Sequence, residues 1–149
     1  MATVLQDAEV TIDTFDATGA PTGNPTDLTD FVSSVTLNAS IDTPEATAMG
    51  DVDRVRLHGI REWSAQITFF QDFGTDSVDS TLWDIVSNFK FVQLNIKPSK
   101  SKPLGVNNPQ YSGRAILPQH SPLAGAKGEV STIDITFQSS GELTRSVTP

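Results

Sequence analysis

The sequence contains no cysteine in 149 residues. This absence excludes a disulfide framework, a thiolate metal site and a thiol nucleophile, so packing alone has to hold the fold together. No apolar run approaches the roughly 20 residues that a membrane-spanning helix needs, and the segment 1–7 lacks the basic start and apolar core of a secretion signal. We therefore expect a single domain, 1–149, that is not addressed to a membrane.

Positive charge is also missing from the first third of the chain. Residues 1–53 contain ten carboxylates and no lysine or arginine, whereas residues 54–149 contain eight carboxylates and ten basic side chains. The two parts carry −10 and +2, which gives the net charge of −8. An acidic surface repels phosphates, so ordinary nucleic-acid binding is disfavoured. The asymmetry either serves solubility or lets an acidic patch on one copy meet the basic segment of the next.

Motifs for catalysis and metal binding are absent as well. His58 and His120 stand alone and are predicted to be surface or turn residues, not ligands. Asp72, Asp76 and Asp79 lack the ligand alternation and the closing glutamate of a calcium-binding loop. No nucleophile elbow, phosphate-binding loop or dinucleotide fingerprint is present. We therefore predict no catalytic residue, no metal and no cofactor, and we do not expect an enzyme.

Alternation of apolar and polar residues is the strongest positive signal, because strands buried on one face show this pattern. The clearest runs are 62–71 and 130–137, which we predict to be paired at the centre of an antiparallel sheet. Their inward faces carry Trp63, Ala65, Ile67 and Phe69 in the first run and Ile133, Ile135 and Phe137 in the second. Further strands are expected at 8–16, 34–41, 91–97 and 111–117, with Val35, Leu37, Ala39 and Ile41 inward in the second of these.

One segment, 77–89, has the apolar spacing of an amphipathic helix that covers the sheet. Asp76 or Ser77 can cap its N-terminus. Its apolar stripe consists of Val78, Leu82, Ile85, Val86 and Phe89, and Trp83 beside the stripe is expected to be buried. Residues 18–26 are a turn-rich loop, and residues 139–149 are a polar C-terminal tail. Six or seven strands with one helix predict a mainly β fold, an antiparallel β-sandwich or partly closed barrel.

The segment 42–59 interrupts the strand pattern for roughly 18 residues, which is unusually long for a hairpin connection. It is either a disordered surface loop or an arm that contact with another subunit orders, and we favour the arm. The basic, proline-bearing segment 97–103 is the natural partner for an acidic patch. The candidate subunit-contact residues in these two segments are Asp42, Glu45, Met49, Asp51, Asp53, Arg54, Arg56, Lys97, Lys100 and Lys102.

Several short motifs follow one another in a recognisable order between Asp27 and Thr144. They are the sequences DLTDF at 27–31 and SVTL at 34–37, the loop 42–51, the strand around Trp63, the pair Asp72-Phe73, the helix around Leu82-Trp83 and a C-terminal strand that ends in TFQSSG at 136–141. This order resembles the tail tube (major tail) proteins of long-tailed bacteriophages.

The resemblance implies a β-sandwich or barrel whose copies form hexameric rings, and the rings stack into a tube in the tail of a virion assembled in the host cytoplasm. The implied partners are further copies of the chain and other tail proteins, such as the tape measure, tail terminator and distal tail proteins. The tube is expected to be an acidic-lined conduit for genome ejection. DNA would pass through the lumen without specific binding, because contacts to a few phosphates per ring would stall it.

Three other functions remain open from the sequence. The first two are a minor tail or tail-completion protein and a capsid decoration protein. The third is a carbohydrate-binding or adhesion β-sandwich, which normally exposes clustered aromatic residues. Trp63 and Trp83 are both expected to be buried here, which argues against that class.

Overall fold

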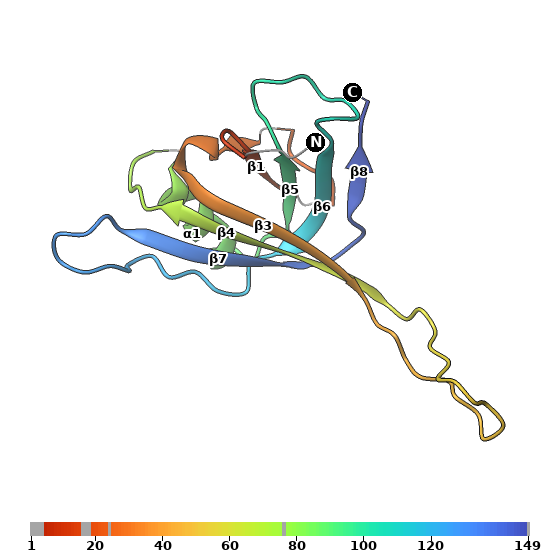
Figure 1. Cartoon of the computed structure of the whole chain (residues 1–149). Helices are drawn as coiled ribbons and strands as arrows, with labels where there is room; N and C mark the ends of the chain where they lie inside the picture. The colour runs from red at the N-terminus through yellow and green to blue at the C-terminus, as the bar shows by residue number, and fades with distance from the viewer. Residues whose placement is uncertain (1–4, 16–18, 24, 76, 149) are drawn as a thin grey trace.

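Eight antiparallel strands and one α-helix make up the part of the chain that the computed structural model describes, residues 5–15, 19–23, 25–75 and 77–148 (Figure 1). The strands run in the order β2-β1-β5-β6-β7-β4-β3, and β8 pairs with β6 beside this path. The strands are β1 (Glu9–Thr14), β2 (Thr26–Asp27), β3 (Val32–Ile41), β4 (Arg61–Phe70), β5 (Val92–Lys97), β6 (Gln110–Ile116), β7 (Thr132–Ser139) and β8 (Thr144–Ser146). The α-helix is α1 (Val78–Ser87), and a short 3-10 helix, η1 (Thr29–Phe31), precedes β3.

The sheet folds into two halves, and β6 is the strand that connects them. The second half of β6 joins β7 through only two residue pairs, Ala115 with Ser139 and Ile116 with Gln138, while its first half pairs with β8. Strands β3, β4 and β7 form one half, and β1, β2, β5, β6 and β8 form the other. The sheet is not closed, since β2 and β3 lie at its two ends. The predicted mainly β, sandwich-like fold with one helix is confirmed, with eight strands in place of the expected six or seven.

The predicted centre of the sheet, β4 beside β7, is confirmed. Ala65 lies opposite Phe137, Ile67 opposite Ile135 and Phe69 opposite Ile133, and all six side chains are buried. Full burial of a side chain such as isoleucine or phenylalanine contributes about 1.5–3 kcal/mol. Core residues from β1, β5 and α1 pack in the same cluster, so both halves of the sheet share one core.

The helix α1 is confirmed, but two of its expected core residues are exposed. Ser77 is the N-cap, since its hydroxyl accepts from the backbone N–H of Ser80, whereas Asp76 lies outside the described residues. Trp83 is 57% exposed, because it lies one position off the buried stripe of Val78, Leu82 and Ile85. The prediction that Trp83 is buried is wrong.

Phe89 is 92% exposed, so its place in the predicted stripe is also wrong. The helix ends at Ser87, and Phe89 follows in the left-handed region with a φ of 54°. The N–H of Lys90 donates to the carbonyl of Ile85 at 3.0 Å, which is the hydrogen bond of a Schellman ending. This turn carries Phe89 away from the core.

The edge strand β3 is less buried than its alternation predicts. Val35 and Leu37 are only half-buried, and Ala39 and Ile41 are exposed, because β3 runs beyond the core and has no strand on its outer side. The predicted tail 139–149 contains β8, so it is not merely a tail. Thr18 and Asn24 of the predicted loop 18–26, and Asp16 of the predicted first strand, lie outside the described residues.

Gly113 in β6 allows a close approach between the two halves of the sheet. A Cβ at this position would lie 2.5 Å from Cζ2 of Trp63 and 3.1 Å from the carbonyl oxygen of Glu142. We expect Gly113→Ala to lower the free energy of unfolding by about 1–3 kcal/mol through overpacking. Urea denaturation measures the change. The matched control is Gly105→Ala, where a Cβ meets nothing within 4 Å, and its effect should stay within about 0.5 kcal/mol. Equal effects of the two substitutions would contradict this packing.

Candidate assembly interface

Residues 42–60 form a two-stranded arm that continues β3 and β4 away from the body (Figure 1). The N–H groups of Asp42, Leu57 and Ala46 donate to the carbonyls of Ile60, Pro44 and Val55 at 3.0, 2.9 and 2.8 Å. A Cβ on Gly59 would lie 2.9 Å from Cβ of Asp42, so glycine lets the two strands approach at the root of the arm. These hydrogen bonds are internal. That contact with another subunit orders the arm stays a prediction.

The tip of the arm is a turn that presents apolar side chains to solvent. The carboxylate of Asp51 accepts from the N–H of Ala48 at 2.7 Å and closes this turn. Met49 and Val52 beside it are fully exposed, and Val55, Leu57 and Ile60 along the arm are exposed as well. Apolar side chains that project from a body in this way mark an interaction surface.

Some charges of the arm are hydrogen-bonded within it, since Glu45 accepts from the hydroxyl of Thr47 and Asp51 from the N–H of Ala48, but others are not. Asp53, Arg54 and Arg56 form no ion pair within the described part of the chain. Glu45 and Arg56 face each other only through their backbones. The arm thus offers both apolar and charged groups to another molecule.

The second predicted contact segment, 97–103, comprises the end of β5 and the first part of the loop between β5 and β6, residues 98–109. Its shape depends on the buried Asn108, whose side-chain amide donates to the carbonyls of Ser99 and Lys102 at 3.0 Å each. The Asp7 carboxylate accepts from the hydroxyl and the N–H of Ser101 at 2.7 and 3.1 Å, and these two hydrogen bonds, the hydroxyl's first, lower the pKa of Asp7. The loop is therefore held firmly against the start of the chain.

Two of the three predicted lysines in this region pair within the chain. Lys97 Nζ lies 3.4 Å from Glu9 Oε2, and Lys100 Nζ lies 2.5 Å from Asp27 Oδ2. Partial burial works to raise the pKa of Asp27, but hydrogen bonds from Lys100 and Thr29 outweigh it and lower that pKa. The same hydrogen bond to Asp27 raises the pKa of Lys100. Lys102 is exposed and forms no ion pair among the described residues, so it remains available to a second molecule.

The structure separates the ten candidate contact residues into two groups. Seven lie on the arm, and the three lysines lie at or beyond the end of β5. The arm extends from the lower right of the body, while the loop that follows β5 stands at the top of the body, away from the tip of the arm (Figure 1). The two groups do not meet within one chain, but they can meet between two chains that stand head to tail.

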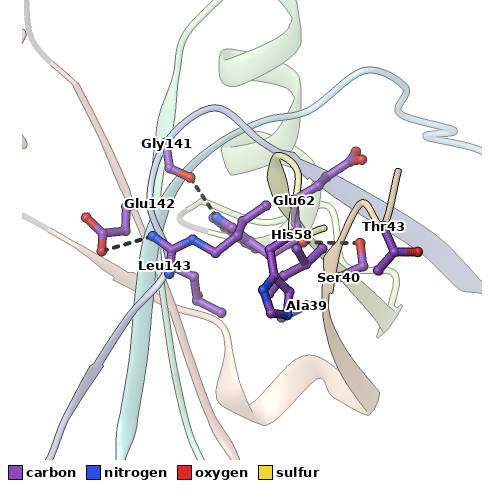
Figure 2. A pocket seen from close by; sticks show the side chains of 11 residues that line it. Ala39, Ser40, Thr43, His58, Glu62, Gly141, Glu142 and Leu143 are labelled. Atoms are coloured by element: carbon purple, nitrogen blue, oxygen red, sulfur yellow. Dashed lines mark hydrogen bonds and ion pairs between the residues drawn. The ribbon is translucent and has the colours of Figure 1, made fainter. Parts of the chain in front are cut away.

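A groove at the root of the arm was not predicted from the sequence. It has a volume of about 760 Å³, and Figure 2 shows His58, Glu62, Glu142 and Leu143 around it. The indole N–H of Trp63 donates to the carbonyl of Gly141 at 3.0 Å, and Arg61 lies 3.6 Å from Glu142. Trp63 lines this groove, and a large aromatic residue in β4 is the feature of the sequence that could have indicated it.

The groove continues beneath β3 as an apolar trough. An adjoining cavity of about 330 Å³ shares Ala39 and Leu143 with the groove. Val35 and Leu37 line it from β3, and Ile96 and Tyr111 line it from the other half of the sheet. The trough exists because the sheet does not close between β3 and this half.

The outer face of β3, β4 and β7 is polar except for the exposed Phe70 at the end of β4, and it lacks positive charge. Its carboxylates are Glu62 and Asp134, and Thr68 donates to Asp134 at 2.6 Å. The other polar side chains of this face are neutral: Ser34, Thr36, Asn38, Ser40, Ser64, Gln66, Thr68, Thr132, Thr136 and Gln138. This polar face is distinct from both the trough and the arm.

Clusters of metal ligands and membrane-spanning helices are both absent from the described residues. No group of three or more potential metal ligands is found there. No helix in that part of the chain is long and apolar enough to cross a bilayer.

Comparison with solved structures places this architecture among phage-tail-like particles. A chain in the tail of an empty gene transfer agent particle, refined with C6 helical symmetry, matches with a TM-score of 0.71 at 14% identity, covering 97% of this chain and 99% of that one. A chain in the virion of a native gene transfer agent particle gives 0.68 at 13% identity, with the same coverage. A chain in the baseplate of the anti-feeding prophage gives 0.61 at 12% identity, covering 97% and 95%.

No protein-family model and no curated protein matches the sequence. At these identities the structural likeness establishes the fold. The chain therefore has the fold found in the tail and baseplate of phage-tail-like particles, as the resemblance in the sequence had predicted.

Proposed function

We propose that this protein is the repeating subunit of a tail tube, in which hexameric rings stack around a bore that carries DNA. One observation carries the proposal: the fold matches, over 97% of the chain, a subunit of a tail refined with C6 symmetry. The open sheet, the projecting arm and the polar face each support one contact that such a tube needs.

Contacts within a ring would be made at β3. An exposed edge strand presents unpaired N–H and C=O groups that can pair with another chain. A neighbouring copy at this edge satisfies these groups and covers the apolar trough beneath β3. A heterologous contact of this kind closes into a ring when the rotation between neighbouring copies completes a full turn after a whole number of copies.

Contacts between rings would be made by the tip of the arm. The tip carries Asp51 and Asp53 beside the apolar Met49 and Val52, and the loop 98–109 offers the cation of Lys102 and an exposed Val106. The loop contains no carboxylate, so its charge complements the tip. The tip of the arm and the loop lie apart within one chain (Figure 1), so the contact would join different copies and can repeat from ring to ring without closing.

The bore would be lined by the polar face of β3, β4 and β7. Neutral hydroxyl and amide groups, together with the carboxylates of Glu62 and Asp134, give phosphates no cation to bind. DNA can then slide, because no counterions are released at fixed positions along the wall.

Three rival functions make different predictions. A minor tail, tail-completion or decoration protein would occur in few copies or on the head, so copy number in purified virions separates them from a tube subunit. The expected burial of Trp63 and Trp83 argued against a carbohydrate-binding module. Trp63 is buried, but Trp83 is exposed, so Trp83 gives this class some support. Binding to a glycan array would distinguish that module.

Shortening the arm should abolish stacking while leaving the fold intact. The change replaces residues 46–55 by Asn-Gly, a two-residue hairpin turn that joins the paired Glu45 and Arg56. Every removed residue is exposed, so thermal unfolding of the variant should match that of the full chain. Negative-stain electron microscopy of the concentrated full chain should show rings and tubes, whereas the variant forms no tubes. Tubes of normal length from the variant would refute the role of the arm.

Reversing one charge of the proposed inter-ring contact should block stacking, and reversing both should restore it. Asp53→Lys and Lys102→Asp each place like charges together, while the double variant exchanges the two signs. Sedimentation of tubes measures the yield, and stacking of the original chain should weaken as salt rises from about 0.05 M to about 0.5 M. The neutral variants Asp53→Asn and Lys102→Met are the matched controls and should lose less. A double variant no better than either single one would disprove this pairing, and salt-independent stacking would disprove the electrostatic contribution.

A further inference from the structure

The segment that joins β6 to β7, residues 117–131, is fastened over the end of β4 and the start of α1. It runs on the side of the molecule away from the arm (light blue to blue in Figure 1). The side-chain amide of Gln71 donates to the carbonyl of Pro122 at 2.6 Å, and the backbone N–H of Gln71 donates to the carbonyl of Ser131 at 3.0 Å. The hydroxyl of Ser131 donates to the carbonyl of Ala124. These bonds hold the segment at two points, near Pro122 and at Ser131.

The side chain of His120 in this segment is 1% exposed. His120 was predicted to be a surface or turn residue; it lies in the connection between β6 and β7, with its ring shielded from solvent. Neither ring nitrogen has a hydrogen-bond partner within the described chain. The nearest charged atom is Oδ1 of Asp79, in the first turn of α1, at 3.7 Å from Nε2, which is too long for a hydrogen bond. A buried polar ring without partners is a costly arrangement, and it packs best when the ring is neutral.

The electrostatics of the site oppose a charged ring in the closed position. Burial lowers the pKa of His120, and the attraction of Asp79, the charged group that acts on the ring, offsets this only in part. When the segment is open and the ring is in water, the pKa returns to about 6.5. The open form therefore takes up the proton first as the pH falls. The closed form therefore has its full stability relative to the open form above about pH 6.5, and this stability decreases as the pH falls below that value.

We propose that His120 is an acid-released latch, in which protonation of the buried imidazole frees residues 117–131 from the first turn of α1. The segment already presents Leu123 and Val130 to solvent, so its release reshapes an outward surface. The latch follows from contacts within one chain, and its test does not depend on the function proposed above.

Hydrogen exchange of the full chain tests the latch at pH 7.5 and pH 5.0. Each variant is compared with the original chain at the same pH, so that the intrinsic effect of pH on exchange cancels. Protection of the Gln71 amide, whose N–H donates to the carbonyl of Ser131 in the closed segment, should fall about tenfold in the original chain on acidification, after correction for the intrinsic rate. The variant His120→Phe should keep its protection at pH 5.0. The matched control is His58→Phe, which removes the other histidine, an exposed residue of the arm, and should behave like the original chain.

A second variant keeps the test decisive if phenylalanine at position 120 disturbs the fold. Asp79→Asn removes the charge that favours a protonated ring in the closed position. It should leave protection unchanged at pH 7.5 and deepen the loss at pH 5.0. Constant protection in the original chain between the two pH values would overturn the latch. An equal loss in a folded His120→Phe variant, or a loss at pH 5.0 that Asp79→Asn does not deepen, would overturn it as well.

Discussion

The sheet ends at β3 with a row of backbone donors and acceptors that no strand of the described chain pairs. An open edge of ten residues is an aggregation hazard for a protein that acts as a monomer, because such an edge can pair with strands of other chains. The same strand leaves an apolar trough between the halves of the sheet, lined by Val35 and Leu37. Both features would be satisfied at once by a neighbouring copy. The single chain thus has a complete core at β4 and β7, but an incomplete surface at β3.

Charge is divided between groups that serve the fold and groups that remain for assembly. Glu9 and Asp27 bind Lys97 and Lys100 within the chain, and Asp7 organises the loop that follows them. This internal pairing uses part of the acidic first third of the sequence. Asp53 of the arm and Lys102 form no ion pair among the described residues, which is why these groups, and not the whole acidic region, form the proposed contact between rings.

Sequence patterns predicted the elements whose two faces meet different surroundings. The runs around Ile67 and Ile135 alternate because one face is core and the other is wet, and the helix was found for the same reason. Its end was misplaced, because apolar spacing does not show where a helix stops, and Phe89 lies beyond it.

Other features left no periodic signal in the sequence. The arm pairs through its backbone and buries neither face, so only its length indicated a special segment. The three residues of β8 are too few to alternate. The burial of His120 depends on a long segment folding over a helix that comes about 40 residues earlier, which local sequence does not record.

The central claim is that another copy completes the edge at β3, and hydrogen exchange of the outward amides of β3, in the assembled and the isolated protein, tests it most directly. The account predicts strong protection of these amides on assembly while the amides of β4 barely change; equal exchange at β3 in both states would contradict it.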